Sequence, residues 1–212
     1  MVFRELTAEE IDVRVSTISD KGCSILLYKD ARCDMNILDE SVGSENWQRS
    51  HELINGNLFC NVSIKCDGEW VTKQDVGTES NTEKEKGQAS DSFKRACFNW
   101  GIGRELYTAP FIWISAKDVK IVDGKNGKPT TYDKFVVSEI EITNKKITRL
   151  VIKNTSTNKD VFRWERKTPI ICPLCKAEIK DVRKDGNIVS AETVYKSCGN
   201  MCLPCYQKQK QQ

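Results

Sequence analysis

Two cysteine pairs near the C-terminal end constrain the fold of this chain more than any other feature. Cys172 and Cys175 form one C-x2-C motif, and Cys202 and Cys205 form a second one 26 residues later. Each C-x2-C turn presents two thiolates from one knuckle, and four thiolates complete the tetrahedral coordination of one Zn2+ ion. Such a site has no open position, so the spacing predicts a structural zinc rather than a catalytic one. Reduced, metal-free structural cysteines are the alternative.

The segment around these pairs is predicted to be a small module of the zinc-ribbon or treble-clef kind. The run "RKTP" (166–169) is its predicted boundary, which gives a main domain of residues 1–168 and a zinc-binding module with a tail at 169–212. Cys198 is a spare cysteine that competes with Cys202 as a ligand, but the C-x2-C spacing favours Cys202.

Composition and charge exclude a membrane span and leave the partner open. No apolar run approaches the ~18 residues that a spanning helix needs, and the first residues lack a secretory apolar core. A cytoplasmic protein with no membrane partner is therefore expected. The net charge is +3, but residues 1–110 hold 13 Lys and Arg against 19 Asp and Glu, and residues 111–212 hold 20 against 11. A polyanion would therefore bind to a local patch of cations rather than to the whole surface.

Hydrophobic periodicity predicts an α+β protein in which an antiparallel β-meander packs on a long helix. Asn55-Gly56 and Asp67-Gly68 separate three strand-like runs, and both dipeptides favour tight hairpin turns. Thr7 and Glu10 form a capping-box pattern that predicts a short helix. The predicted helices are 6–18, 31–42 and 82–100, and the predicted strands are 23–28, 46–54, 58–66, 69–77 and five further runs after Pro110. Trp70, Trp113 and Trp164 are expected in the core, with base stacking as the alternative for any of them that is exposed.

The stretch "ASDSFKRACFNWGIGRELY" (89–107) is the most informative part of the main domain. Its apolar residues share one helical face that should pack on the meander; they are Ala89, Phe93, Ala96, Cys97 and Trp100. Lys94 and Arg95 project from the side or back of this helix, within reach of Asp91. Spacing alone favours an exposed, ion-paired face, and leaves contact with a phosphate as the other interpretation. The helix is expected to begin at an N-cap on Asn81 or Thr82.

Neither glycine-containing loop fits a nucleotide site. A dinucleotide loop opens a helix, whereas Gly101-Ile102-Gly103 closes one, so Gly101 is interpreted as a left-handed C-cap. The run "GKNGKPT" fails as a Walker loop because Lys128 is followed by proline. No nucleotide cofactor is therefore expected.

At these residues the chain resembles the Rad-fifty-two type of single-strand DNA annealing protein, in its phage recombinase branch. The helix of that family carries a pattern like D-x-x-K-R-A-x-x-x-x-G, which Asp91, Lys94, Arg95, Ala96 and Gly101 match. The runs "LTAEEIDVRVS", "NW" (46–47) and "CDGEWVTKQDVG" extend the similarity over roughly residues 6–110.

The resemblance implies a homo-oligomeric ring or helical filament with single-stranded DNA in a basic groove across subunits. It makes Arg14 the counterpart of a DNA-contacting arginine, and Lys94 and Arg95 the residues that hold phosphates while the bases stay free to pair. The family often has a further basic residue where this chain has Phe98. The hairpin cations Lys145, Lys146, Arg149 and Lys153 are candidates for the missing charge, or are lysines that guard an exposed edge strand.

The function expected from this resemblance is ATP-independent binding and annealing of single-stranded DNA in recombination and repair, without covalent catalysis. A single-strand-binding or replication protein is a further expected partner, and the basic flank of the cysteine module permits such a contact. One alternative is a metal-dependent nuclease with a zinc ribbon, using Asp75, Glu79 and Asp91 as carboxylates. Another is a zinc adaptor that binds only protein. The lone His51 makes a Ser-His-Asp triad improbable.

Overall fold

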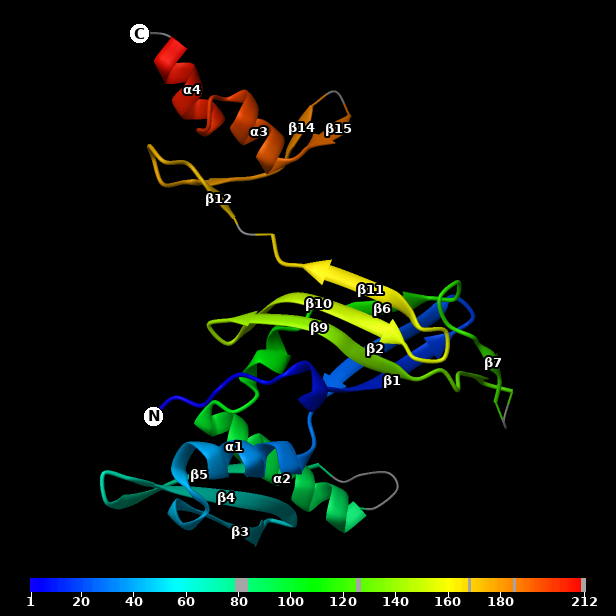
Figure 1. The fold of residues 1–212 in the computed structure, drawn as a ribbon, viewed down its shortest axis with the longest axis vertical. Helices are drawn as coiled ribbons and strands as arrows, with labels where there is room; N and C mark the ends of the chain where they lie inside the picture. The colour runs from blue at the N-terminus through cyan, green and yellow to red at the C-terminus, as the bar shows by residue number, and fades with distance from the viewer. Residues whose placement is uncertain (79–83, 125–126, 168, 185, 211–212) are drawn as a thin grey trace. The chain divides into compact units, whose positions relative to one another are not determined.

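The computed structural model describes residues 1–78, 84–124, 127–167, 169–184 and 186–210. They divide into two compact units, Met1–Glu165 and Arg166–Gln212 (Figure 1). Each unit is built round a hydrophobic cluster of its own. Within the described ranges, no helix is both long and apolar enough to cross a membrane.

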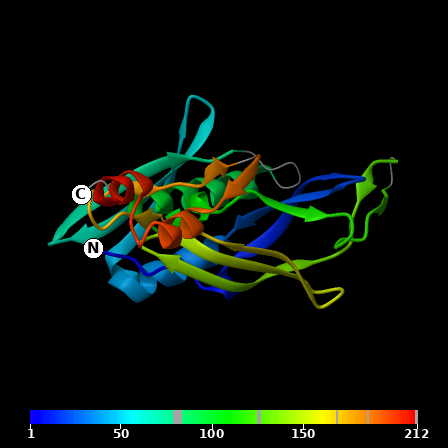
Figure 2. The ribbon, with the colours of Figure 1, turned by 90° about the horizontal axis from the view of Figure 1, so that it is seen from above.

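Three consecutive strands of the first unit form the predicted meander. Strands β3 (Trp47–Ile54), β4 (Asn57–Cys66) and β5 (Glu69–Val76) pair antiparallel in chain order. The residues of both connecting turns, Asn55-Gly56 and Asp67-Gly68, all have positive φ. These are the backbone angles of a type I′ hairpin turn, for which Asn-Gly and Asp-Gly are the preferred dipeptides. In Figure 2 the β3–β4 hairpin (cyan) and the hairpin (yellow) of β10 (Lys146–Asn154) and β11 (Lys159–Glu165) project from the first unit in different directions.

The long helix α2 (Lys84–Trp100) packs on β4 and β5 of this meander, as predicted. Its predicted apolar stripe is buried at Phe93, Ala96 and Cys97, each fully shielded from solvent. The helix α1 (Ala31–Val42) packs against α2 and also contacts β3 of the meander (Figure 1). The α+β fold class is therefore confirmed. The N-cap expected at Asn81 or Thr82 lies outside the described residues.

Helix α2 ends at its glycine as the sequence predicts. Gly101 has a φ of 98°. Its N–H donates to the carbonyl of Phe98 at 2.9 Å, and the N–H of Ile102 donates to the carbonyl of Cys97 at 3.1 Å. This pair of bonds is the Schellman motif, in which a left-handed residue satisfies the last carbonyls of a helix. Ile102, the residue after the glycine, is buried and anchors the chain as it leaves the helix.

Two further three-stranded antiparallel sheets complete the core of the first unit. One sheet has the order β1-β2-β6 and the other β11-β10-β9. Buried residues from both sheets, such as Ile25, Ile114 and Leu150, belong to one hydrophobic cluster with α1 and α2. The bounds are β1 (Asp12–Ser19), β2 (Gly22–Tyr28), β6 (Ile112–Ser115), β9 (Phe135–Thr143), β10 (Lys146–Asn154) and β11 (Lys159–Glu165), with the short pair β7 (Val122–Asp123) and β8 (Pro129–Thr130).

The helix predicted over residues 6–18 is wrong beyond residue 10. A 3-10 turn, η1 (Ala8–Glu10), follows Thr7, whose N–H donates to the Glu10 carboxylate at 2.9 Å. From Asp12 the chain is strand β1. Val13 and Val15 pack against the core while Asp12 and Arg14 are exposed, which is the two-residue alternation of a half-buried strand. Thr7 and Glu10 do form a capping box, but the helical turn that they cap ends at Glu10.

The second unit is small and is built from two short hairpins and two helices. Three of the five buried residues of its cluster are cysteines. Helix α4 reaches Lys210, so the described part of the predicted tail is helical. The bounds are β12 (Ile170–Ile171), β13 (Glu178–Ile179), β14 (Val182–Lys184), β15 (Asn187–Val189), α3 (Ala191–Ser197) and α4 (Leu203–Lys210).

Candidate nucleic-acid interface and metal centre

A cavity of about 350 Å3 in the first unit brings together two residues that lie 80 positions apart in the sequence. Arg14 comes from β1 and Lys94 from α2, and both were predicted to contact DNA. Strand β2 supplies part of the wall between them, and the segment after α2 closes the rim. The lining residues are Arg14, Leu26, Leu27, Tyr28, Lys29, Asp91, Lys94, Phe98, Leu106 and Tyr107.

Two of the three cations that line this cavity, Arg14 and Lys94, are not neutralised by salt bridges with described residues. Among the described residues, neither Arg14 nor Lys94 forms an ion pair. The Arg14 guanidinium lies over the ring of Tyr28, 5.7 Å from its centroid, in cation–π geometry. Lys94 is half-buried on the cavity wall. Both groups therefore keep their hydrogen-bond donors available for an anionic ligand.

Among the described residues, Asp91 pairs with neither Lys94 nor Arg95. Its carboxylate accepts hydrogen bonds from the N–H of Thr78 at 2.9 Å and from the Thr78 hydroxyl at 3.1 Å. Arg95 instead lies 3.3 Å from the carboxylate of Asp75 on β5 and does not line the cavity. The structure therefore differs from the ion-paired face that spacing favoured. Lys94 forms no salt bridge with a described residue, and Arg95 pairs with Asp75.

One residue that lines the cavity, Lys29, belongs to a buried ion pair. The Lys29 ammonium bonds the carboxylate of Asp34 on α1, and their side chains are 1% and 0% exposed. Burial raises the pKa of Asp34 to about 6, against the opposing effect of Lys29. Gly103, whose φ is 73°, passes so close that a Cβ there would lie 2.3 Å from Cε of Lys29. Sequence reasoning missed this pair, since only the three-dimensional packing joins its members.

Phe98 has a structural role that the sequence left open. Its ring meets Tyr107 edge-on, with centroids 5.0 Å apart and planes at 68°. The Lys29 ammonium lies 4.5 Å from the Phe98 centroid on the buried side. Phe98 therefore forms an aromatic wall of the cavity and covers the buried cation.

The cations of the β9–β10 hairpin lie apart from this cavity. Lys145 donates from its ammonium to the carbonyl of Arg4 at 2.7 Å. Arg149 forms salt bridges with Glu139 at 2.6 Å and with Glu141 at 3.4 Å, both on the neighbouring strand. Lys146 is exposed. Two of these three predicted contacts are therefore already engaged within the chain.

The four cysteines predicted as metal ligands lie together in the second unit. Their sulfur atoms are all within 4.8 Å of one another, and Sγ of Cys175 is 3.5 Å from Sγ of Cys202. Four thiolates at the usual zinc–sulfur distance of about 2.3 Å lie about 3.8 Å apart. The residues present therefore fit a tetrahedral metal ion such as zinc. Backbone N–H groups of Cys175 and Cys202 lower the pKa of Cys172 to about 6, which favours the thiolate that a metal requires.

Local structure explains how the chain presents these sulfurs. The N–H of Lys176 donates to the carbonyl of Cys172 at 2.9 Å, which closes the first knuckle. Cys202 directly precedes α4, and Cys205 lies in its first turn. Cys198 is buried but lies outside the group, so the choice of Cys202 over Cys198 agrees with the geometry.

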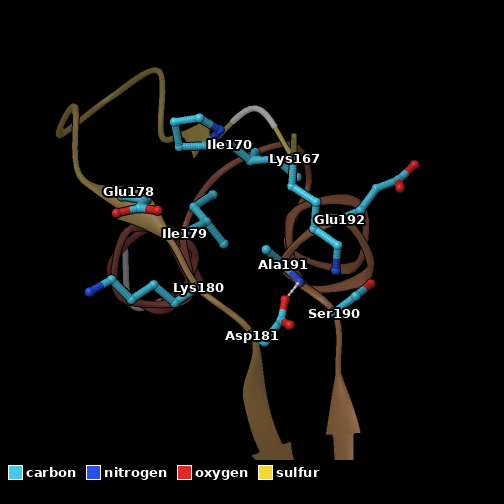
Figure 3. Close-up of a pocket in the computed structure, with 10 residues that line it drawn as sticks. Lys167, Ile170, Glu178, Ile179, Lys180, Asp181, Ser190, Ala191 and Glu192 are labelled. Atoms are coloured by element: carbon cyan, nitrogen blue, oxygen red, sulfur yellow. Dashed lines mark hydrogen bonds between the residues drawn. The ribbon is translucent and has the colours of Figure 1, made fainter. Parts of the chain in front are cut away.

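A second cavity, of about 630 Å3, lies within the second unit (Figure 3). Its lining residues are Lys167, Pro169, Ile170, Glu178, Ile179, Lys180, Asp181, Ser190, Ala191 and Glu192. The Asp181 carboxylate turns toward α3 and accepts a hydrogen bond from the N–H of Ala191 at 2.7 Å, whereas Lys180 points away. Three acids against two lysines give this hollow no preference for a polyanion.

The carboxylates of the nuclease alternative have other partners. Asp75 accepts hydrogen bonds from the N–H of Val76 and from Arg95, and Asp91 is held by Thr78. Glu79 lies outside the described residues. Within the part of the chain that is described, the four cysteines are the group of metal-ligating side chains that the structure gathers.

Comparison with known proteins gives two distant relatives. The chain is 32% identical over 98 residues to the single-stranded DNA-binding protein DdrA of Deinococcus radiodurans, covering 45% of this chain and 47% of that protein. It is also 32% identical over 98 residues to the DdrA of Deinococcus deserti, covering 45% of this chain and 48% of that protein. The aligned region thus spans about half the length of the curated relatives that the chain matches. No protein-family model matches the chain.

Proposed function

We propose that this protein binds single-stranded DNA and anneals complementary strands without ATP, in DNA recombination and repair. The observation that carries this proposal is the cavity of the first unit, which Arg14 and Lys94 both line without forming an ion pair among the described residues. The proposal is also supported by the distant similarity to proteins named for single-stranded DNA binding.

The proposed mechanism is physical and forms no covalent bond. Phosphates of one strand bind Arg14 and Lys94, which releases condensed counterions and reduces the repulsion between two strands. The bases remain accessible, so a second strand can sample registers until pairing and stacking hold it. Arg95, Lys145, Lys146 and Arg149 extend the path of the strand in this proposal, with Arg95 exchanging Asp75 for a phosphate.

The wider assembly remains part of the proposal. The protein would act in the cytoplasm, that of the host cell if it is phage-encoded, as a ring or helical filament of identical subunits. The cysteine module would hold one structural Zn2+ through Cys172, Cys175, Cys202 and Cys205. The first unit would bind and anneal the strands. A single-strand-binding or replication protein would be a further partner.

The direct test mixes the purified protein with two complementary oligonucleotides in the absence of ATP. Duplex formation is followed by fluorescence energy transfer between labelled strands, and the particles are imaged in the same samples. We expect duplex to form faster than without protein. Degradation of the strands with Mg2+ would identify a nuclease instead, and no binding at low salt would leave the protein-binding zinc adaptor.

Removing both cavity cations should weaken DNA binding and its salt dependence together. Arg14→Ala with Lys94→Ala deletes two phosphate contacts, each worth about tenfold or more in affinity. The slope of log K against log salt should fall in magnitude by roughly 1.4, at about 0.7 per phosphate of a single strand. Binding to a labelled oligonucleotide from 50 mM salt upward, measured by fluorescence anisotropy, gives both quantities.

A charge-matched control distinguishes binding at the cavity from general electrostatic attraction between the protein and DNA. Lys65 and Lys117 are exposed and lie outside the cavity, so Lys65→Ala with Lys117→Ala removes the same charge. This control should keep most of the affinity. Equal losses in the two double variants would show that the cavity has no special role in binding.

A further inference from the structure

The β1-β2-β6 sheet has one face in the core and one face open to solvent. On the inner face, Cys23, Ile25 and Ile114 are fully or almost fully buried. On the outer face, Tyr28 is 37% exposed and Trp113 is 40% exposed. The prediction that Trp113 belongs to the core is therefore wrong, because the alternation of β6 turns Ile112 and Ile114 inward instead.

Aromatic side chains continue along the segment that leads into this sheet. Tyr107 is 69% exposed and Phe111 is 78% exposed. We call Tyr28, Tyr107, Phe111 and Trp113 the aromatic face. Trp113 lies against the backbone of Gly22, where a Cβ would come within 2.9 Å of the indole. The sheet thus makes room for an indole that it does not bury.

The aromatic face adjoins the proposed phosphate-binding cations. Strand pairing puts Arg14 opposite Leu26, on the face that carries Tyr28. Both Tyr28 and Tyr107 also line the cavity with Arg14 and Lys94. Flat apolar rings therefore lie directly beside unpaired cations, which is the combination that proteins use to bind a single strand along both its bases and its backbone.

We propose that the aromatic face stacks the bases of the strand whose phosphates Arg14 and Lys94 hold. This inference rests on the proposed function and extends it to the bases. A single strand is the occupant that matches both features, since it carries a phosphate charge and a flat aromatic ring in every nucleotide. Stacking tolerates any base, because every base has a π-face.

Stacking on this face would also suit annealing. A base that lies against an aromatic ring presents its pairing edge outward, so a second strand can pair with it. The stacking contacts with the protein are then replaced one base at a time. A binding site that read base edges by hydrogen bonds would block the same edges.

The test compares an oligothymidylate strand with an abasic strand of equal length, which has the same phosphates and no bases. The variants are Trp113→Leu and Phe111→Ala, which alter exposed rings outside the cavity. We expect each to weaken binding of oligothymidylate by roughly tenfold, within the range of about 5- to 150-fold for loss of one stacked base. Binding of the abasic strand and the salt slope should stay unchanged, and Trp113→Phe should retain most of the affinity.

Exposed aromatic residues elsewhere in the first unit supply matched controls. Trp70 on β5 is 45% exposed and Tyr132 is 79% exposed, so Trp70→Leu and Tyr132→Ala should bind both strands as the wild type does. Thermal unfolding of every variant checks that the fold persists.

The outcomes separate this inference from the function on which it rests. If the wild-type protein binds both strands equally, base stacking is overturned and DNA binding stands. If it binds neither strand, the proposed function fails and the inference fails with it. Variants that lose affinity for both strands while the particles fall apart would make this face a contact between copies of the chain.

Discussion

A chelator that strips Zn2+ from the purified chain is expected to unfold residues 166–212 and leave residues 1–165 folded. The second unit has fewer than about 50 residues, a size at which an apolar core alone rarely suffices. Two of the five buried residues of its cluster, Cys172 and Cys202, are themselves ligands. Binding of a structural zinc contributes about 10–16 kcal/mol to the folding of such modules, which far exceeds what this core supplies.

The measurement is hydrogen exchange of the full chain before and after chelation, with metal content determined in parallel. Amides of residues 170–206 should lose protection, while those of the meander and α2 keep it. Cys172→Ser should reproduce the loss without a chelator. Cys198→Ser is the matched control, because Cys198 is buried yet outside the four-cysteine group, and it should retain one metal ion per chain. Protection that survives complete removal of metal would contradict a structural zinc.

Replacing Lys29 by methionine is expected to destabilise the first unit by about 3–5 kcal/mol. The substitution keeps an apolar stem of similar length but removes the charge that compensates the fully buried Asp34. A buried ion that loses its partner retains its desolvation penalty, and breaking such pairs typically costs this much. One oxygen of Asp34 already lacks a hydrogen-bond partner. Chemical denaturation of the full chain, monitored by tryptophan fluorescence, measures the change.

The control removes both charges together. Lys29→Met with Asp34→Ala should recover most of the lost stability, because an uncharged site leaves no ion unpaired. A double variant as unstable as the single one would mean that packing under Phe98, rather than charge, explains the loss.

The pair also predicts a pH dependence. The folded-state pKa of Asp34, about 6, lies above the ordinary aspartate value of 3.8, so the folded state binds this proton more tightly than the unfolded state does. The contribution of Asp34 to stability therefore falls as the pH rises from about 4 to about 6. Relative to the double variant, the wild type should lose stability over that interval.

Local features of the fold were predictable from the sequence alone. Asn-Gly and Asp-Gly specify two-residue turns because their residues tolerate positive φ, so the meander and its register follow from a few letters. Gly101 closes α2 for the same reason. The C-x2-C spacing likewise predicts which cysteines meet, since each knuckle is a local structure and four sulfurs have one common geometry.

The failure at residues 11–18 has a local cause. Thr7 and Glu10 carry a genuine helix-start signal, but such a signal says nothing about how far a helix extends. The alternation of Val13 and Val15 with polar residues was the better guide to the strand. Trp113 was misplaced for a related reason, since alternation alone does not say which face of a strand is buried.

Only the tertiary structure decided the composition of the candidate site. The packing of β1, β2, α1 and α2 creates the cavity that Arg14 and Lys94 line and the ion pair of Lys29 with Asp34. It also sets the role of Phe98. Periodicity and capping report the conformation of a few neighbouring residues, whereas a cavity is a property of surfaces distant in the chain. The sequence therefore determined the elements and the metal-ligand set of this protein, and packing determined which cations remain free, because a side chain is neutralised by whatever acid the fold brings near it.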